Sequence, residues 1–174
     1  MALTKINNNT LSAVTTLPFG TGITVADQWR LTTSFNGAIS PIASNLERVD
    51  TGGQGFIGTA MSESSGIFTF PSTGVYSVSF HVIGVANGVT GFYHGNNIQV
   101  TTNNSSYTNV AASYSNQTAT SNYIGFTTES LVDVTSTTNV KVRFTIGVAN
   151  SSMTTQGNST RNDTFMTFTR LGDT

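Results

Sequence analysis

Apolar and polar residues alternate over several segments of this chain. In the segment NVKVRFTI, four apolar residues at every second position are expected to face a core: Val140, Val142, Phe144 and Ile146. The residues between them are expected to face water: Lys141, Arg143 and Thr145. Because side chains at alternate positions of a strand share one face, this pattern predicts a half-buried β-strand.

The first strand of this kind is expected just after residue 26. One face of it carries Trp29, Leu31 and Phe35, and the other carries Arg30, Thr32 and Ser34. The first face is expected to be buried and the second, with Arg30, to be wet. Further short strands follow, separated by clusters of Asn, Ser, Gly and Thr that are typical of turns.

The stretch GIFTFPSTGVYSVSF, residues 66–80, predicts two strands joined by a tight turn. Before the turn, Phe68 and Phe70 share one face, and after it three residues do so: Tyr76, Val78 and Phe80. Pro71 fixes its own φ and Gly74 tolerates a positive φ, so both suit a turn.

These patterns predict an all-β chain. Helix-forming runs with apolar residues three or four apart are missing, and β-branched residues dominate. Many short antiparallel strands indicate a two-sheet jelly-roll sandwich, which we expect over residues 27–174. Residues 1–26 are expected to form an extended arm, either a loose terminus or a strap that orders against a partner through Leu17, Pro18 and Phe19.

The turn region also resembles a known family. Its pattern of Phe68, Phe70, Pro71, Gly74, Tyr76 and Phe80 is similar to the motif of the complement-one-q and tumour-necrosis-factor jelly-roll superfamily. The likeness continues at SLVDVTSTTNVKVRFTI and at the closing TFMTFTRL. It implies a ten-strand jelly roll that assembles as a compact homotrimer. The opening MALTKINNNTLSAV resembles tailed-phage virion proteins of the marine and cyanobacterial type, which implies a place on a virus particle.

Composition narrows the range of partners. Only 9% of the residues are charged and the formal net charge is −1, so neither nucleic acid nor an anionic membrane is an expected partner. The chain has no cysteine, which excludes thiolate chemistry and disulfides. It shows no signal peptide and no run long enough to span a bilayer.

No residue pattern predicts catalysis, a cofactor or a metal. His81 and His94 have no metal-ligand spacing to other His or carboxylate residues, so each is expected to be structural or on the surface. The carboxylates are scattered, and an enzyme such as a glycan hydrolase would need two of them to converge in a cleft. We therefore expect a non-enzymatic protein without cofactor or metal.

Aromatic residues mark the candidate binding surface. GFYHG places Phe92, Tyr93 and His94 between two glycines near an expected loop, where they either contact a partner or fill the core or a trimer axis. The same alternatives apply to Tyr107, Tyr114 and Tyr123.

The leading hypothesis is a trimeric phage capsid decoration protein, a cement protein that binds the major capsid protein or another virion protein and stabilises the head surface. The alternative is a fibre-tip or receptor-binding module whose loops at 87–97 and 103–109 contact a host-surface glycan or protein.

Overall fold

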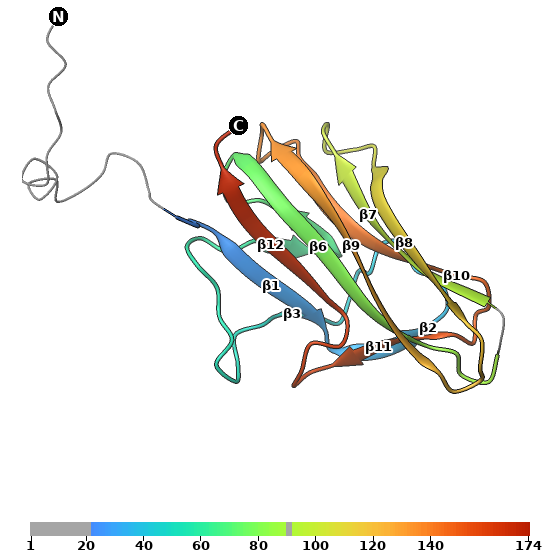
Figure 1. Cartoon of the computed structure of the whole chain (residues 1–174). Coiled ribbons are helices and arrows are strands. Elements are labelled where there is room, and N and C mark those ends of the chain that lie inside the picture. Colours follow the sequence, from blue (N-terminus) through green and yellow to red (C-terminus); the bar gives the residue numbers. More distant parts are fainter. Residues whose placement is uncertain (1–21, 90–91) are drawn as a thin grey trace, which may run out of the picture.

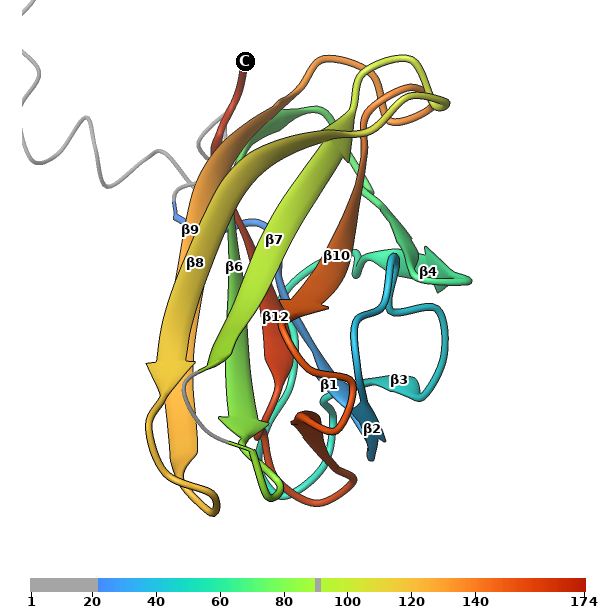
Figure 2. The same ribbon diagram turned by 90° about the vertical axis from the view of Figure 1, so that its right-hand side faces the viewer.

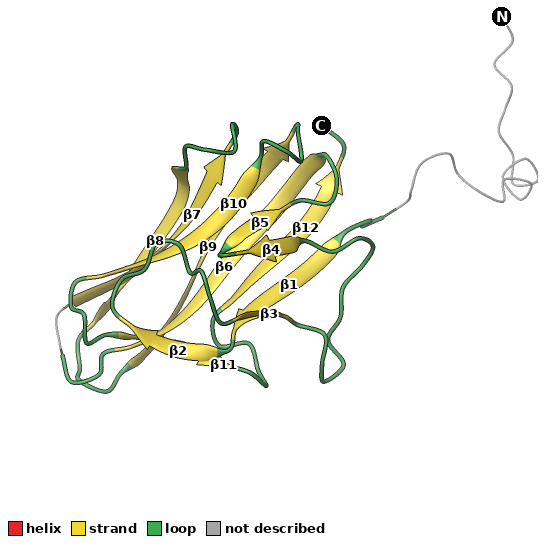
Figure 3. Ribbon diagram, turned by 180° about the vertical axis from the view of Figure 1, so that it is seen from behind, coloured by secondary structure: helices red, strands yellow, loops and turns green. Residues whose placement is uncertain are grey.

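The computed structural model describes residues 22–89 and 92–174 of the chain. Every regular element in these residues is a β-strand, and they include no helix that could cross a membrane (Figure 3). The all-β prediction is confirmed. Leu17, Pro18 and Phe19 lie outside the described residues, whereas Val25 and Ala26, the last two residues of the expected arm, already belong to the sandwich.

Twelve strands make up this part of the chain. In sequence order they are β1 (Ala26–Leu31), β2 (Thr33–Asn36), β3 (Leu46–Arg48), β4 (Ser62–Ser64), β5 (Ile67–Thr69), β6 (Gly74–Val85), β7 (Phe92–Thr101), β8 (Thr108–Gln117), β9 (Tyr123–Val134), β10 (Lys141–Val148), β11 (Thr154–Asn158) and β12 (Phe165–Gly172). The two long strands β6 and β9 pair antiparallel over their whole length.

The strands form two antiparallel sheets that pack face to face (Figure 1). The seven-stranded sheet has the order β2-β11-β6-β12-β1-β3, with β9 also paired to β6. The five-stranded sheet has the order β4-β5-β10-β7-β8. At one edge of the sandwich β8 lies beside β9, so the two sheets meet there (Figure 2). This arrangement is a jelly roll, as predicted.

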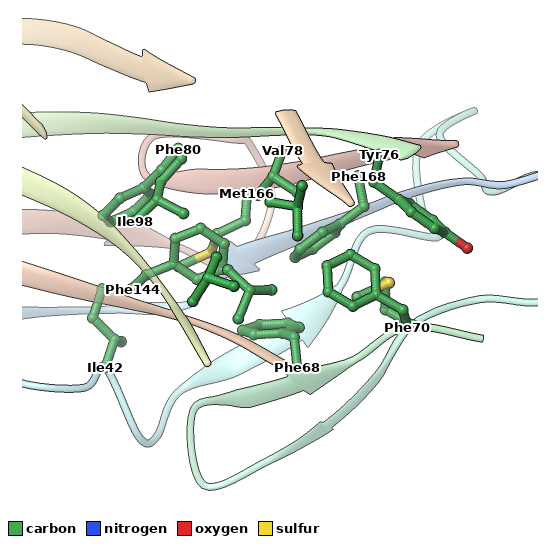
Figure 4. Packing of buried hydrophobic residues seen from close by; sticks show 14 of the residues in the cluster. Ile42, Phe68, Phe70, Tyr76, Val78, Phe80, Ile98, Phe144, Met166 and Phe168 are labelled. Carbon is green, nitrogen blue, oxygen red and sulfur yellow. The ribbon is translucent and has the colours of Figure 1, made fainter. Parts of the chain in front are cut away.

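Aromatic side chains from both sheets fill the core (Figure 4). The Phe68 ring from the five-stranded sheet lies 5.2 Å from Phe168 and 5.5 Å from Phe144, measured between ring centroids. Tyr76, Val78 and Phe80 of β6 are fully buried, and every apolar residue predicted to face inward in NVKVRFTI is buried. Such aromatic contacts add to the burial of apolar area that stabilises the fold.

The turn at residues 71–73 connects strands of different sheets. Gly74 has a φ of 135°, as the sequence predicted, and a Cβ atom there would lie 2.4 Å from the Gly172 carbonyl oxygen. The Tyr76 hydroxyl group donates a hydrogen bond to the Ser72 carbonyl oxygen at 3.1 Å. The chain thus leaves β5 in one sheet and enters β6 in the other, which brings the rings of Phe70 and Tyr76 to 4.7 Å.

The prediction that Arg30 faces water is wrong. Its side chain is only 1% exposed, because Glu47 stands opposite it on β3 and accepts a hydrogen bond from Nε at 2.7 Å. Thr51 accepts a further hydrogen bond from this guanidinium group. Thr145, also expected in water, is 4% exposed, and its hydroxyl oxygen accepts a hydrogen bond from the side-chain amide of Asn97. Alternation alone predicts neither contact.

Candidate interaction surfaces

The structure separates the residues of GFYHG. Tyr93 lies on the outer face of the five-stranded sheet and is 46% exposed, while the side chain of Phe92 lies outside the described residues. His94 is fully buried between the sheets, so of the two alternatives expected for this residue the structure shows the core position and not a partner contact. The reason is register: β7 begins at residue 92, so alternation turns residue 94 inward.

His94 belongs to a polar end of the sandwich interior, formed by the buried side chains of His94, Asn96, Gln117 and Thr155. The Nε2 atom of His94 lies 3.0 Å from the Thr155 hydroxyl oxygen, and Nδ1 has no hydrogen-bond partner among the described residues. Burial lowers the pKa of His94 from 6.5 to about 4. The imidazole is therefore neutral at pH 7, and its ring packs between the two sheets.

Two tyrosines cover a glycine floor on the outer face of the five-stranded sheet. Gly95 on β7 and Gly147 on β10 are directly opposite each other. The Tyr114 ring lies so close to Gly95 that a Cβ atom there would be 2.5 Å from two ring carbons. Tyr93 packs edge-on against Tyr114, with ring centroids 5.8 Å apart. Gly95 thus lets the Tyr114 ring lie directly on the strand beside Tyr93, while 63% of Tyr114 stays exposed.

Further along the same face, a chain of hydrogen bonds crosses three strands. Nε of Arg143 donates to the side-chain oxygen of Gln99 at 2.6 Å, and the Gln99 amide nitrogen donates to Asn109 at 2.7 Å. The Arg143 guanidinium also stacks on the Tyr107 ring, 4.0 Å from its centroid. Burial raises the pKa of Tyr107, and the Arg143 charge opposes that shift. These mutual contacts preorganise the side chains of this face for binding.

The two cations of this face lack a carboxylate partner. Among the described residues, four arginines are paired with carboxylates: Arg30, Arg48, Arg161 and Arg170. Lys141 instead donates hydrogen bonds to the Thr69 hydroxyl and the Thr137 carbonyl oxygen. Together with Arg143 it gives this face a local positive charge on a chain of net charge −1.

The outer face of the seven-stranded sheet is also partly apolar. Tyr123 and Leu131 of β9 are 70% and 65% exposed. Between them, the His81 ring packs against Phe165 at 5.0 Å, and its Nδ1 lies 2.8 Å from the Thr127 hydroxyl oxygen. Burial also lowers the pKa of His81. An antiparallel sheet that faces water normally carries polar residues there, so this face is suited to a contact.

The carboxylates of the described chain serve mainly structural contacts. Asp27 accepts hydrogen bonds from the Trp29 indole and the Met61 backbone, and Glu129 accepts one from Ser77. Across residues 22–89 and 92–174, no three His, Cys, Asp or Glu side chains gather where they could hold a metal ion.

The chain resembles known proteins in its fold and not in its sequence. No protein-family model and no curated protein sequence matches the chain. Among solved structures, murine APRIL at pH 5.0 matches with a TM-score of 0.60 at 12% identity, over 84% of this chain and 98% of the other. The Eiger TNF of S. frugiperda matches with a TM-score of 0.60 at 10% identity, over 86% and 93%. The chain therefore has a tumour-necrosis-factor-like jelly-roll fold.

Sequence reasoning missed the composition of the outer face of the five-stranded sheet. The alternation in NVKVRFTI pointed Lys141 and Arg143 outward, but it could not show that β10 lies beside β7 and brings Arg143 to Gln99. The glycine floor is marked in the sequence only by one glycine in each of two strand segments, Gly95 and Gly147. Single glycines in strands are too common to predict a site.

Proposed function

We propose that the protein is a non-enzymatic, self-associating structural protein of a phage particle: a homotrimeric decoration protein that binds the major capsid protein. The observation that carries this proposal is the partly apolar outer face of the seven-stranded sheet, with Tyr123 and Leu131 exposed. Covering these side chains with another copy would remove apolar area from water. The sequence resemblance supports both the trimer and the phage setting.

Self-association is tested by light scattering of the purified chain at micromolar and at tenfold lower concentration. The expected mass is three times the 18.3 kDa of one chain. Leu131→Asp should lower it to the mass of one chain, because it places a carboxylate inside the contact. Tyr114→Asp is the matched control, since it introduces the same charge at a residue that is similarly exposed but lies on the other sheet. A monomeric parent chain would refute the trimer.

The particle setting needs a separate test. Antibodies raised against the purified chain should label the heads of intact phage particles from the source of the sequence, viewed by electron microscopy. Labelling of tail tips alone would favour the receptor-binding alternative. Particles that carry no label would refute a place on the virion.

A further inference from the structure

The geometry points to a second binding surface: we propose that the outer face of the five-stranded sheet binds an oligosaccharide that carries a carboxylate group. The face is built from β7, β8 and β10, which lie side by side (Figure 2). It lies on the sheet opposite to the one assigned to self-association. The inference therefore does not depend on the proposed function, and it would give the receptor-binding alternative a ligand class and a location.

The exposed tyrosines of this face are suited to stacking against a sugar ring. Sugar rings bind proteins by stacking their C–H faces on aromatic rings while polar side chains bind the hydroxyl groups. Tyr114 packs on Gly95 and Tyr93 packs edge-on against Tyr114, so stacking on these rings costs little conformational entropy. A ring that served only the core would not leave 63% of its surface in water, as Tyr114 does.

Polar side chains lie next to the tyrosines. Asn116 pairs with Tyr93 across the strands, and Asn97 follows Gly95 on the same side of β7. The side-chain oxygen of Asn97 is buried and its nitrogen is held by Thr145, so this oxygen is not open to a ligand. Asn116 is exposed, and its neutral amide can donate to and accept from the hydroxyl groups of a sugar.

This face also carries positive charge. Arg143 and Lys141 are the cations of the described chain that have no carboxylate partner, and both lie on this face. Guanidinium groups bind carboxylates well, because their N–H groups match the two oxygens. Nε of Arg143 is already held by Gln99, which fixes the direction of the other N–H groups.

The spacing of these features favours an oligosaccharide over a single sugar. Gly147 and Arg143 are four residues apart on β10, about 13 Å along a strand. A ligand that contacts both ends must therefore extend over several sugar units. Two cations can pair with a ligand that carries one or two carboxylates. A densely sulfated polymer would instead require a strongly basic surface with many cations.

The test is binding of the intact, fluorescently labelled protein to an array that displays neutral, sialylated, uronic-acid and sulfated glycans. We expect binding to be confined to the carboxylated glycans. Tyr114→Ser and Arg143→Gln should each weaken it by about tenfold or more, while Tyr114→Phe, which keeps the ring, should stay within about threefold. Arg161→Gln is the charge-matched control, because Arg161 is an exposed cation whose partner is Asp163.

Several outcomes would overturn the inference. They are no binding to any glycan, binding only to neutral or sulfated glycans, and binding that Tyr114→Ser and Arg143→Gln leave unchanged. Thermal unfolding of each variant shows whether a loss of binding reflects a loss of fold. Light scattering of the same samples keeps the two proposals apart, since a monomer that binds carboxylated glycans would refute self-association alone.

Discussion

The imidazole ring of His94 on β7 lies against the backbone of Gly84 on β6, in the opposite sheet. A Cβ atom at position 84 would be 2.5 Å from Nδ1 and 2.9 Å from Cε1 of that ring. Real Cβ atoms do not approach other atoms so closely, so the two sheets can hold this separation only if residue 84 is glycine. The contact joins the sheets where polar residues replace the aromatic core.

Gly84→Ala is expected to destabilise the fold by about 1 to 3 kcal/mol, because the His94 ring or the sheet must move. The matched control is Gly125→Ala on β9, where a Cβ atom would meet its nearest neighbour, His81, at an ordinary 3.7 Å. Urea unfolding of both variants gives the comparison. Equal stabilities would show that the His94 ring is free to shift.

His94 is also expected to make stability depend on pH. Since burial lowers its pKa from 6.5 to about 4, the unfolded chain binds more protons than the folded one between these values. The contribution of His94 to the free energy of unfolding is therefore fully present above pH 6.5. This contribution is lost as the pH drops towards 4, and the total loss is about 3 kcal/mol.

This dependence is measured by urea unfolding of the parent chain and of His94→Gln at pH 7 and pH 4. Carboxylates contribute to the acid sensitivity of both proteins, so the difference between them isolates His94. The variant should lose less free energy than the parent. An identical loss in both would contradict the buried neutral imidazole.

Phe68→Ala should be among the most damaging single substitutions. The Phe68 ring is fully buried and packs against Trp29, Phe144 and Phe168, so its loss leaves a cavity worth about 3 to 5 kcal/mol. Phe56→Ala, at a residue that is 50% exposed, should cost under about 1 kcal/mol. Thermal midpoints that fall equally in the two variants would mean that the centre of the core lies elsewhere.

Asp27→Ala is expected to destabilise the protein by about 2 to 3 kcal/mol. Asp27 is buried and accepts hydrogen bonds from Trp29 and Met61 as well as from Arg48 at 3.3 Å, and these donors would lose their partner. This expected destabilisation is smaller than that for breaking a fully buried ion pair, because the Arg48 side chain is 30% exposed.

Asp173→Ala is the matched control for this ion pair. Asp173 binds Arg170 but is 93% exposed, so its removal should change stability by less than about 0.5 kcal/mol. Denaturant unfolding distinguishes the two cases. A similar small change for both substitutions would show that Asp27 is replaced in its contacts by water.

The sequence predicted the fold wherever apolar residues alternate without interruption. Tyr76, Val78 and Phe80 show this in β6, as do the inward residues of β10, because a period of two is a strong signal for a half-buried strand. The same signal is lost in the first half of β7, where the inward positions 94 and 96 are polar and the outward Tyr93 is aromatic, so hydropathy assigns the wrong faces there. In the second half of β7 it holds, since Ile98 and Val100 face inward and are buried.

Partners that are distant in sequence account for the other failures. The burial of Arg30 depends on Glu47, 17 residues later, and alternation carries no information about such a pair. The candidate glycan surface likewise depends on the neighbours of β7 in the sheet, since Gln99 meets Arg143 from β10 and Asn109 from β8. The connection between β5 and β6 reads as an ordinary turn, although its strands belong to different sheets.

The contrast between the aromatic core and the polar end has a consequence for β6, which passes through both. Near Tyr76 and Phe80 the strand is covered by tightly packed rings (Figure 4), whereas near Gly84 it faces His94, whose buried Nδ1 has no hydrogen-bond partner among the described residues. Local opening should be easier where fewer apolar contacts are broken. One continuous strand would then exchange its amide protons with solvent at two rates, slowly in its first half and faster in its second.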